Sequence, residues 1–432
     1  MQEKYSGSHP NIWYPFTPIK GAPTPLKVTS GNGAWIELAG GKQLLDLISS
    51  WWVNVLGHAR PEIADAIHGQ AKCLEHVIFA GFTHEPAEKL AETLAGKLPG
   101  RLNRVFYSDN GSSAVEIAIK QAWQYWANLG EKRESFICFD HGYHGDTFGA
   151  MSVSARSLFT DVYKELLFPV ESVPYPVTWR GDDEIQEKEA AALGRLTQLL
   201  EQNPKRYAAI IIEPLVQGAG GMRMCRPEFL QALRRLSHEH DTLLIFDEVM
   251  TGFGRTGAWF ACERAGIEPD VIALAKGLTG GFLPLAATVC SDSVYEAFAS
   301  ADPAKTLFHG HSYTANPLGC AAANATLKLL EQNEYAFKNL EQEHIEHLAK
   351  LEDHPKLDKI RVTGTIAAMD IKTADRPGYL NQVSAIIKRK AFEQGLLLRP
   401  LGNVLYLMPP YCITRDELAQ AYRGIAAILD EL

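Results

Sequence analysis

The sequence predicts an α/β fold with a mostly parallel central sheet flanked by helices and a smaller α+β domain. Three observations predict it. Between residues 60 and 330, short apolar runs alternate with helical patterns, which is typical of a parallel sheet with helices on both faces. After residue 330 the pattern changes to charged helical stretches around a few short strands. A chain of 432 residues is also too long for one core, so we expect two or three lobes.

The expected strands of the large domain are runs rich in Leu, Ile and Val that turn residues bound. They cover residues 104–109, 135–140, 206–213, 242–247, 270–276 and 284–290. A helix is expected after Ser113, because apolar residues recur there at helical spacing. The charged stretch 181–204 predicts a surface helix. We assign residues 61–330 to this domain.

The small C-terminal α+β domain is expected over residues 331–432. Its expected elements are a strand region at 359–371, a helix near 379–394, short strands at 396–400 and 404–408, and a closing amphipathic helix. Residues 1–60 carry turn signals at 31–33 and 40–41. We expect this N-terminal segment to pack with the small domain.

Composition restricts the class of partner. A net charge of -9 argues against nucleic acid, which selects basic surfaces. No apolar stretch is long enough to span a membrane, and the N-terminus lacks the apolar core of a signal peptide. The seven cysteines are scattered and form no C-x-x-C pair, which indicates reduced thiols in a cytoplasm and no zinc site.

The most informative feature is a pair of residues, Asp247 and Lys276, each at the end of a short apolar run. Two such strands would bring both side chains to the edge of the sheet, where open α/β sheets bind ligands. A carboxylate beside an amine suits pyridoxal 5'-phosphate (PLP). The Lys forms a Schiff base with this cofactor, and the Asp keeps the pyridine nitrogen protonated.

The segment DNGSS at 109–113 lies between an expected strand and an expected helix. Small residues there leave backbone N–H groups free at a helix N-terminus, which is a ready phosphate site. An ordinary helix cap explains Asn and Ser equally well when the segment is taken alone. The Asp–Lys pair favours the phosphate site.

The segment HGYHGD at 141–146 follows the next strand, and Tyr143 could stack on a planar cofactor ring. Its two histidines, and those of HGH at 309–311, lack the further ligands that a metal site needs. The segment GFGRTG at 252–257 formally matches a dinucleotide fingerprint, with Asp270 as the ribose-binding acid. Polar and bulky residues separate this segment from its strand, and Asp270 opens a strand instead of ending one, so both details count against that alternative.

Two features suggest a substrate pocket. Arg399 ends an apolar run in the small domain, where it either clamps a substrate carboxylate or forms a surface salt bridge. Trp51 and Trp52 form an unusual aromatic pair, which either packs in a core or walls a pocket for an apolar or aromatic substrate.

Taken together and in this order, the motifs resemble the class III aminotransferases of PLP fold type I. The resemblance spans nearly the whole chain. Its diagnostic segments are IIEP at 211–214, FDE at 246–248, GFGRTG at 252–257, AKG at 275–277 and NP at 316–317. Longer segments resemble one branch of that class, namely IWYPFT at 12–17, SSWW at 49–52, GYHGDTFGAMS at 142–152, QGAGGMR at 217–223 and LYLMPPY at 405–411.

The resemblance implies a two-step transamination in which Lys276 is the Schiff-base lysine and moves the proton, Asp247 pairs with the pyridinium nitrogen and Tyr143 stacks on the ring. The cofactor-binding residues that it implies are Gly111, Ser112, Tyr143, Asp247, Lys276, His311 and Ser312. The substrate-binding residues that it implies are Phe16, Trp51, Trp52, Tyr143, Arg255, Lys276, Gly310, Arg399 and Tyr406.

The resemblance also implies a homodimer with active sites at the interface, because Gly310, His311 and Ser312 would come from the second subunit. Arg399 would bind the carboxylate of a keto acid, with Arg255 and Tyr406 nearby. Phe16 stands where the family commonly has Tyr, so its ring can stack but cannot donate a hydrogen bond. Ser312 replaces a common Thr and keeps the hydroxyl.

Overall fold

The central sheet of the computed structural model, which describes residues 9, 11–374 and 378–432, has seven strands in the order β4-β12-β11-β10-β7-β5-β6. These strands are β4 (Leu102–Ser108), β5 (Ser135–Phe139), β6 (Glu171–Val173), β7 (Tyr207–Ile212), β10 (Leu243–Asp247), β11 (Val271–Leu274) and β12 (Ala286–Ser291). Only β12 runs antiparallel to its neighbours. The expected mostly parallel sheet is confirmed, and the short edge strand β6 was not anticipated.

Two cores sandwich this sheet because successive side chains of a strand point to opposite faces. Ile245 of β10 packs with helices on one face, and Phe246 packs on the other. The first face is covered by α4 (Gly111–Asn128), α5 (Phe148–Val153) and α9 (Asp292–Glu296). The second is covered by α3 (Glu85–Lys97), α6 (Ile185–Gln202), α7 (Pro227–Glu239), α8 (Ala261–Ala265) and α10 (Pro317–Gln332), with α2 (Pro61–Cys73) packed on α10.

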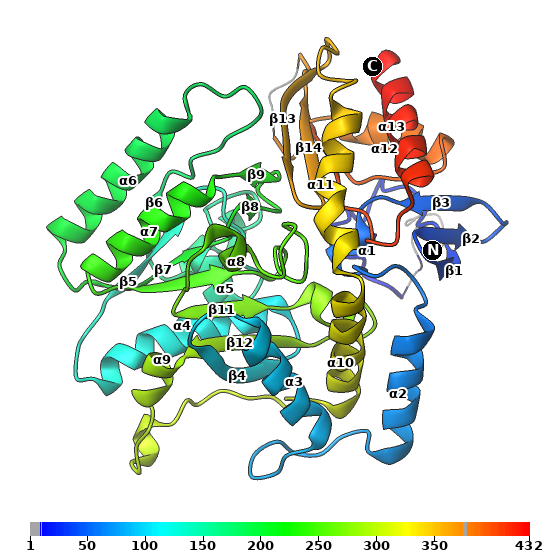
Figure 1. The fold of residues 1–432 in the computed structure, drawn as a ribbon. Coiled ribbons are helices and arrows are strands. Elements are labelled where there is room, and N and C mark those ends of the chain that lie inside the picture. The colour runs from blue at the N-terminus through cyan, green and yellow to red at the C-terminus, as the bar shows by residue number, and fades with distance from the viewer. Residues whose placement is uncertain (1–8, 10, 375–377) are drawn as a thin grey trace.

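A smaller α+β part lies beyond the carboxyl ends of the parallel strands (Figure 1). Its antiparallel sheet joins β13 (Leu357–Thr363), β14 (Ile366–Ile371) and β16 (Val404–Leu407), with α11 (Glu334–Leu348), α12 (Val383–Glu393) and α13 (Arg415–Asp430) beside it. The strand expected at 396–400 is shorter than predicted. It forms only β15 (Leu396–Leu397), and Pro400 offers no backbone donor to extend it.

The N-terminal strands belong to the same region as the C-terminal helices, as Figure 1 shows. They are β1 (Val28–Asn32), β2 (Trp35–Leu38) and β3 (Gln43–Asp46). β3 pairs with β15 in parallel, and the Met408 amide donates to the Leu47 carbonyl at 2.7 Å. Segments about 350 residues apart in the chain therefore form one sheet, and α1 (Ser49–Trp52) follows β3 directly.

The remaining short elements are η2 (Asp161–Leu166), β8 (Val216–Gln217), β9 (Arg223–Met224), η3 (Lys276–Thr279) and η4 (Pro303–Lys305). Among the described residues, none of the helices combines the length and apolarity that crossing a bilayer requires.

Candidate active site

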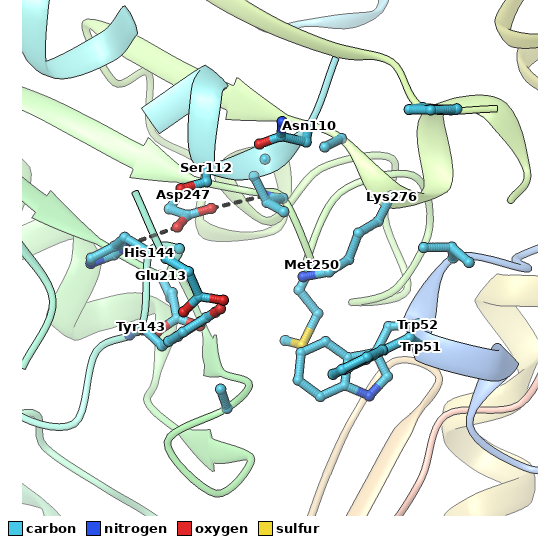
Figure 2. Close-up of a pocket in the computed structure, with 18 of the residues that line it drawn as sticks. Trp51, Trp52, Asn110, Ser112, Tyr143, His144, Glu213, Asp247, Met250 and Lys276 are labelled. Atoms are coloured by element: carbon cyan, nitrogen blue, oxygen red, sulfur yellow. Dashed lines mark hydrogen bonds and ion pairs between the residues drawn. The ribbon is translucent and has the colours of Figure 1, made fainter. Parts of the chain in front are cut away.

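A cavity of about 770 Å³ lies where the carboxyl ends of β10 and β11 meet α1 and the small α+β part. Asp247 ends β10, and Lys276 follows β11 at the start of η3. These strands are parallel neighbours with Asp247 opposite Ala273, so the two functional side chains emerge at the same edge. Figure 2 shows them in the cavity with Tyr143, Trp51 and Trp52.

Lys276 has a backbone conformation that is uncommon for a residue with a side chain. Its φ of 43° lies in the left-handed region, where strain is often found at functional sites. Its amine nitrogen lies 4.8 Å from the ring centre of Trp52. Burial lowers the pKa of Lys276, although the carboxylates of Asp247 and Glu213 act against this shift. The amine therefore loses its proton more readily than an ordinary lysine does.

Asp247 is held by a buried histidine that the sequence did not single out. His144 Nδ1 lies 2.6 Å from Asp247 Oδ2, and the Val249 amide donates to Asp247 Oδ1 at 3.1 Å. Burial opposes the charged form of His144, but the hydrogen bond and charge of Asp247 together raise its pKa. The pair orients the carboxylate at the end of the strand. Its sequence signal was the second histidine of the 141–146 segment.

Glu213 is a second missed residue. Its carboxylate accepts hydrogen bonds from the amides of Tyr143 at 3.0 Å and Gly218 at 2.9 Å. Burial raises the pKa of Glu213 to about 7. The carboxylate thus ties the turn that bears Tyr143 to the strand end at β7, and it places Tyr143 at the cavity wall.

The N-terminus of α4 forms the other end of the cavity. Asn110 caps the helix by accepting from the Ser113 amide at 2.9 Å, so the Gly111 and Ser112 amides precede the first helical hydrogen bond. The Ser112 hydroxyl lies 2.8 Å from the hydroxyl of Thr147. A Cβ on Gly111 would lie 2.5 Å from Val249 Cγ1. Only glycine fits here without displacing Val249.

The residues present fit PLP. An anion-binding helix end, a carboxylate braced by histidine and a lysine with a lowered pKa line one cavity of sufficient size. The sequence predicted that Asp247 and Lys276 meet in one pocket at the sheet edge, and both side chains line this cavity.

Aromatic side chains form the outer wall of the cavity. Trp52 is buried, and its indole N–H donates to the Tyr406 hydroxyl at 2.9 Å. Trp51 is 41% exposed, and its ring centre lies 5.8 Å from that of Phe16. The sequence did not single out Phe159 and Tyr379, which also line the cavity.

The two candidate arginines occupy different environments. Arg399 lines the cavity, its guanidinium carbon lies 4.5 Å from the ring centre of Trp51, and it has no acidic ion-pair partner among the described residues. Arg255 is fully buried instead and does not line the cavity. It donates to the carbonyls of Trp52 at 3.2 Å and Pro409 at 2.9 Å. The sequence placed Arg255 among the substrate-binding residues, whereas the structure makes it a brace beneath Trp52.

The segment containing Gly310, His311 and Ser312 does not line this chain's own cavity. The Thr314 hydroxyl accepts from the His311 amide at 3.0 Å and donates to the His311 carbonyl at 2.9 Å. Lys120 of α4 donates to the Phe308 carbonyl and holds the start of the segment. Gly310, His311 and Ser312 therefore lie outside the cavity that contains Lys276 of the same chain.

The glycine-rich segment 252–257 forms turns that contact other parts of the chain. A Cβ on Gly254 would lie 2.8 Å from the ring of Phe337. Close packing against this ring accounts for the glycine, and the segment does not line the cavity. The geometry gives the dinucleotide alternative no support.

Comparison with known proteins places these features in a family. The family described as "Aminotransferase class-III" matches residues 17–429. The adenosylmethionine-8-amino-7-oxononanoate aminotransferase of Synechococcus elongatus is 58% identical over 98% of this chain and 100% of its own length. The enzyme of the same name from Geobacter sulfurreducens is 42% identical over 94% of this chain and 93% of its own.

Solved structures of transaminases have the same fold as this chain. The crystal structure of adenosylmethionine-8-amino-7-oxononanoate aminotransferase from Methanocaldococcus jannaschii has a TM-score of 0.90 at 34% identity, covering 98% of this chain and 97% of that one. A PLP-bound amine transaminase from an uncultivated Pseudomonas species has a TM-score of 0.91 at 31% identity, covering 98% and 99%.

Proposed function

The chain belongs to the class III aminotransferases and is a PLP-dependent transaminase, and on that premise we propose the reaction that it performs. It moves an amino group from S-adenosylmethionine to 8-amino-7-oxononanoate and yields 7,8-diaminononanoate for biotin biosynthesis. The observation that carries the proposal is the full-length match, at 58% identity, to a relative named for this reaction. The aromatic cavity supports it together with Arg399, which has no acidic ion-pair partner in the described part of the chain, because the acceptor is a long apolar chain that ends in a carboxylate.

When bound, PLP accepts the electrons that remain when an amine substrate loses its α-proton. Asp247, oriented by His144, keeps the ring nitrogen protonated. Lys276 would hold the cofactor, and its amine would move the proton, because its lowered pKa favours the uncharged form. The helix end at Gly111 and Ser112 holds the phosphate, and Ser112 is steadied there by Thr147.

The substrate end of the cavity is lined by aromatic rings and by Arg399. Its guanidinium binds the carboxylate of the keto acid, and the ring of Trp51 on which it stacks limits its motion. Trp52 and Tyr406 form a hydrogen-bonded wall that excludes water from the reacting amine. Tyr143, whose amide donates to Glu213, lines the cavity where it would contact the cofactor ring.

The active assembly in this proposal is a homodimer in the cytoplasm. Large apolar side chains flank the segment of Gly310, His311 and Ser312 in the chain and are exposed, namely Phe308 at 68% and Tyr313 at 65%. Such a patch is typical of an interface. In the dimer, Gly310, His311 and Ser312 of each chain complete the site of the other.

A second candidate is an ω-aminotransferase that uses ornithine, 4-aminobutyrate or a diamine. The TM-score of 0.91 to an amine transaminase favours it, since the shared fold leaves the donor open. The proposed acceptor could also be aminated with lysine as donor.

Product analysis by mass spectrometry separates these functions. The purified protein with PLP is incubated with 8-amino-7-oxononanoate and either S-adenosylmethionine or lysine. We expect diaminononanoate in the incubation with S-adenosylmethionine and none in the incubation with lysine. Product with lysine alone would overturn the donor, and no product from a protein that transaminates ω-amines would overturn the acceptor.

A further inference from the structure

Phe159 lies at the centre of an aromatic cluster, of which the reaction described above uses only Tyr143. Its ring centre lies 5.9 Å from Phe16, 6.4 Å from Tyr143 and 5.0 Å from Tyr379. The interplanar angles are 86°, 69° and 76°. Rings at such steep angles present an edge of one ring to the face of another. The rings of Phe159 and its three neighbours all line the active-site cavity.

These rings have more contact with solvent than stable packing requires. Phe16 is 48% exposed and Tyr379 is 41% exposed. Trp51 already stacks with Arg399 at 4.5 Å, so its ring is partly occupied by a cation that belongs to the protein. The cluster around Phe159 is the part of the aromatic wall left for a ligand.

The charges of the cavity favour a cationic ligand beside this cluster. The cavity is lined by three basic residues, namely Lys276, Arg399 and His144, of which His144 pairs with Asp247, and by a larger number of acidic residues. The acidic residues are Asp109, Asp146, Glu213 and Asp247. The faces of aromatic rings attract cations, and the attraction strengthens when water is excluded.

We propose that Phe159, together with Phe16 and Tyr379, recognises the sulfonium cation of the amino donor, which makes Phe159 a residue that determines donor specificity. This inference rests on the proposed function, because S-adenosylmethionine carries a sulfonium. Its demethylated form, S-adenosylhomocysteine, is a neutral thioether with the same reactive amine and the same adenosyl group. Aromatic rings that bind the charge would prefer the first compound over the second.

The test compares Phe159→Leu, which keeps an apolar side chain without a π face, with the conservative Phe159→Tyr. The first readout is kcat/KM of the holoenzyme for each compound in the donor half-reaction. The visible absorbance of the cofactor reports the progress of this half-reaction. We expect the preference for the sulfonium compound to fall roughly 5- to 30-fold in Phe159→Leu. It should stay within about 2-fold of the original in Phe159→Tyr, since the phenol retains the π face.

A second readout is independent of turnover. Calorimetry measures the dissociation constants of both compounds for PLP-loaded Lys276→Ala protein, with and without Phe159→Leu, and we expect the same loss of preference. The melting temperature of Phe159→Leu should stay close to that of the unmodified chain, which would show that the protein remains folded.

Equal losses for both compounds would overturn the proposal, because Phe159 would then pack against the adenosyl group. An unchanged preference would also overturn it. If the unmodified enzyme fails to transaminate S-adenosylmethionine, yet calorimetry shows a sulfonium preference that depends on Phe159, the proposed function fails and the aromatic site remains. If the unmodified enzyme transaminates S-adenosylmethionine but neither readout shows a preference, the proposed function stands and this inference fails.

Discussion

Acid should destabilise the small α+β part through one buried histidine. His344 of α11 is fully buried, and its Nδ1 lies 2.7 Å from the Tyr422 hydroxyl of α13. Burial lowers the pKa of His344 to about 4 from an ordinary value of 6.5, so the folded protein keeps this ring neutral.

The sign and size follow from proton linkage. A depressed folded-state pKa gives stability that is fully present above pH 6.5 and is lost as the pH falls toward 4, because the unfolded chain binds the proton first. At pH 5 the loss from this one group is roughly 2 kcal/mol, and at pH 7.5 it is near zero. Glu213 and Glu248 act in the opposite sense, since burial raises the pKa of each to about 7.

The assay isolates His344 by comparison with a variant. Urea denaturation at pH 7.5 and pH 5.0 gives the change in unfolding free energy for the unmodified chain and for His344→Gln, which cannot titrate. We expect the variant to lose about 2 kcal/mol less than the unmodified chain between the two pH values. The exposed His68→Gln serves as the matched control. Equal losses in His344→Gln and the unmodified chain would refute the argument.

Further predictions concern the site. Lys276→Ala should abolish turnover and the visible absorbance of the Schiff base between Lys276 and the cofactor, and a variant that keeps this absorbance and full activity would contradict the assignment. Arg399→Met should raise the KM for the keto acid roughly 10- to 150-fold, because hydrogen bonds to charged groups are worth about 1.5–3 kcal/mol; steady-state kinetics would show this, and an unchanged KM would place the carboxylate elsewhere. Gly111→Ala should weaken PLP binding, because its Cβ would lie 2.5 Å from Val249 Cγ1; equilibrium dialysis of the apoprotein measures it, and unchanged affinity would exclude Gly111 from the phosphate site. His144→Ala should lower kcat while the protein still binds PLP, because Asp247 loses the partner at 2.6 Å; a normal kcat in stopped-flow measurements would show that this contact is dispensable.

Local chemistry accounts for what could be predicted from the sequence. The runs that became β10 and β11 are apolar throughout because both faces of the sheet are covered. Asp247 and Lys276 break those runs, so their place at the strand ends was visible without a structure. The segment from Asn110 to Ser112 showed a helix start in the same way, because helix caps depend on neighbouring residues.

The tertiary structure decided which distant residues join the site. Glu213 and His144 are separated from their partners Tyr143 and Asp247 by 70 and 103 positions, so the local sequence could not show these contacts. The sequence placed Arg255 in the substrate pocket, but the chain path over Trp52 and Pro409 encloses it. Phe159 contacts the rings of Phe16 and Tyr379, which are distant in the chain, and only the folded structure shows these contacts. The periodicity of strands and helices depends on neighbouring residues, whereas the shape of a cavity depends on long-range packing. For this reason the sequence determined the chemistry of the site, and the tertiary structure determined which residues form its walls.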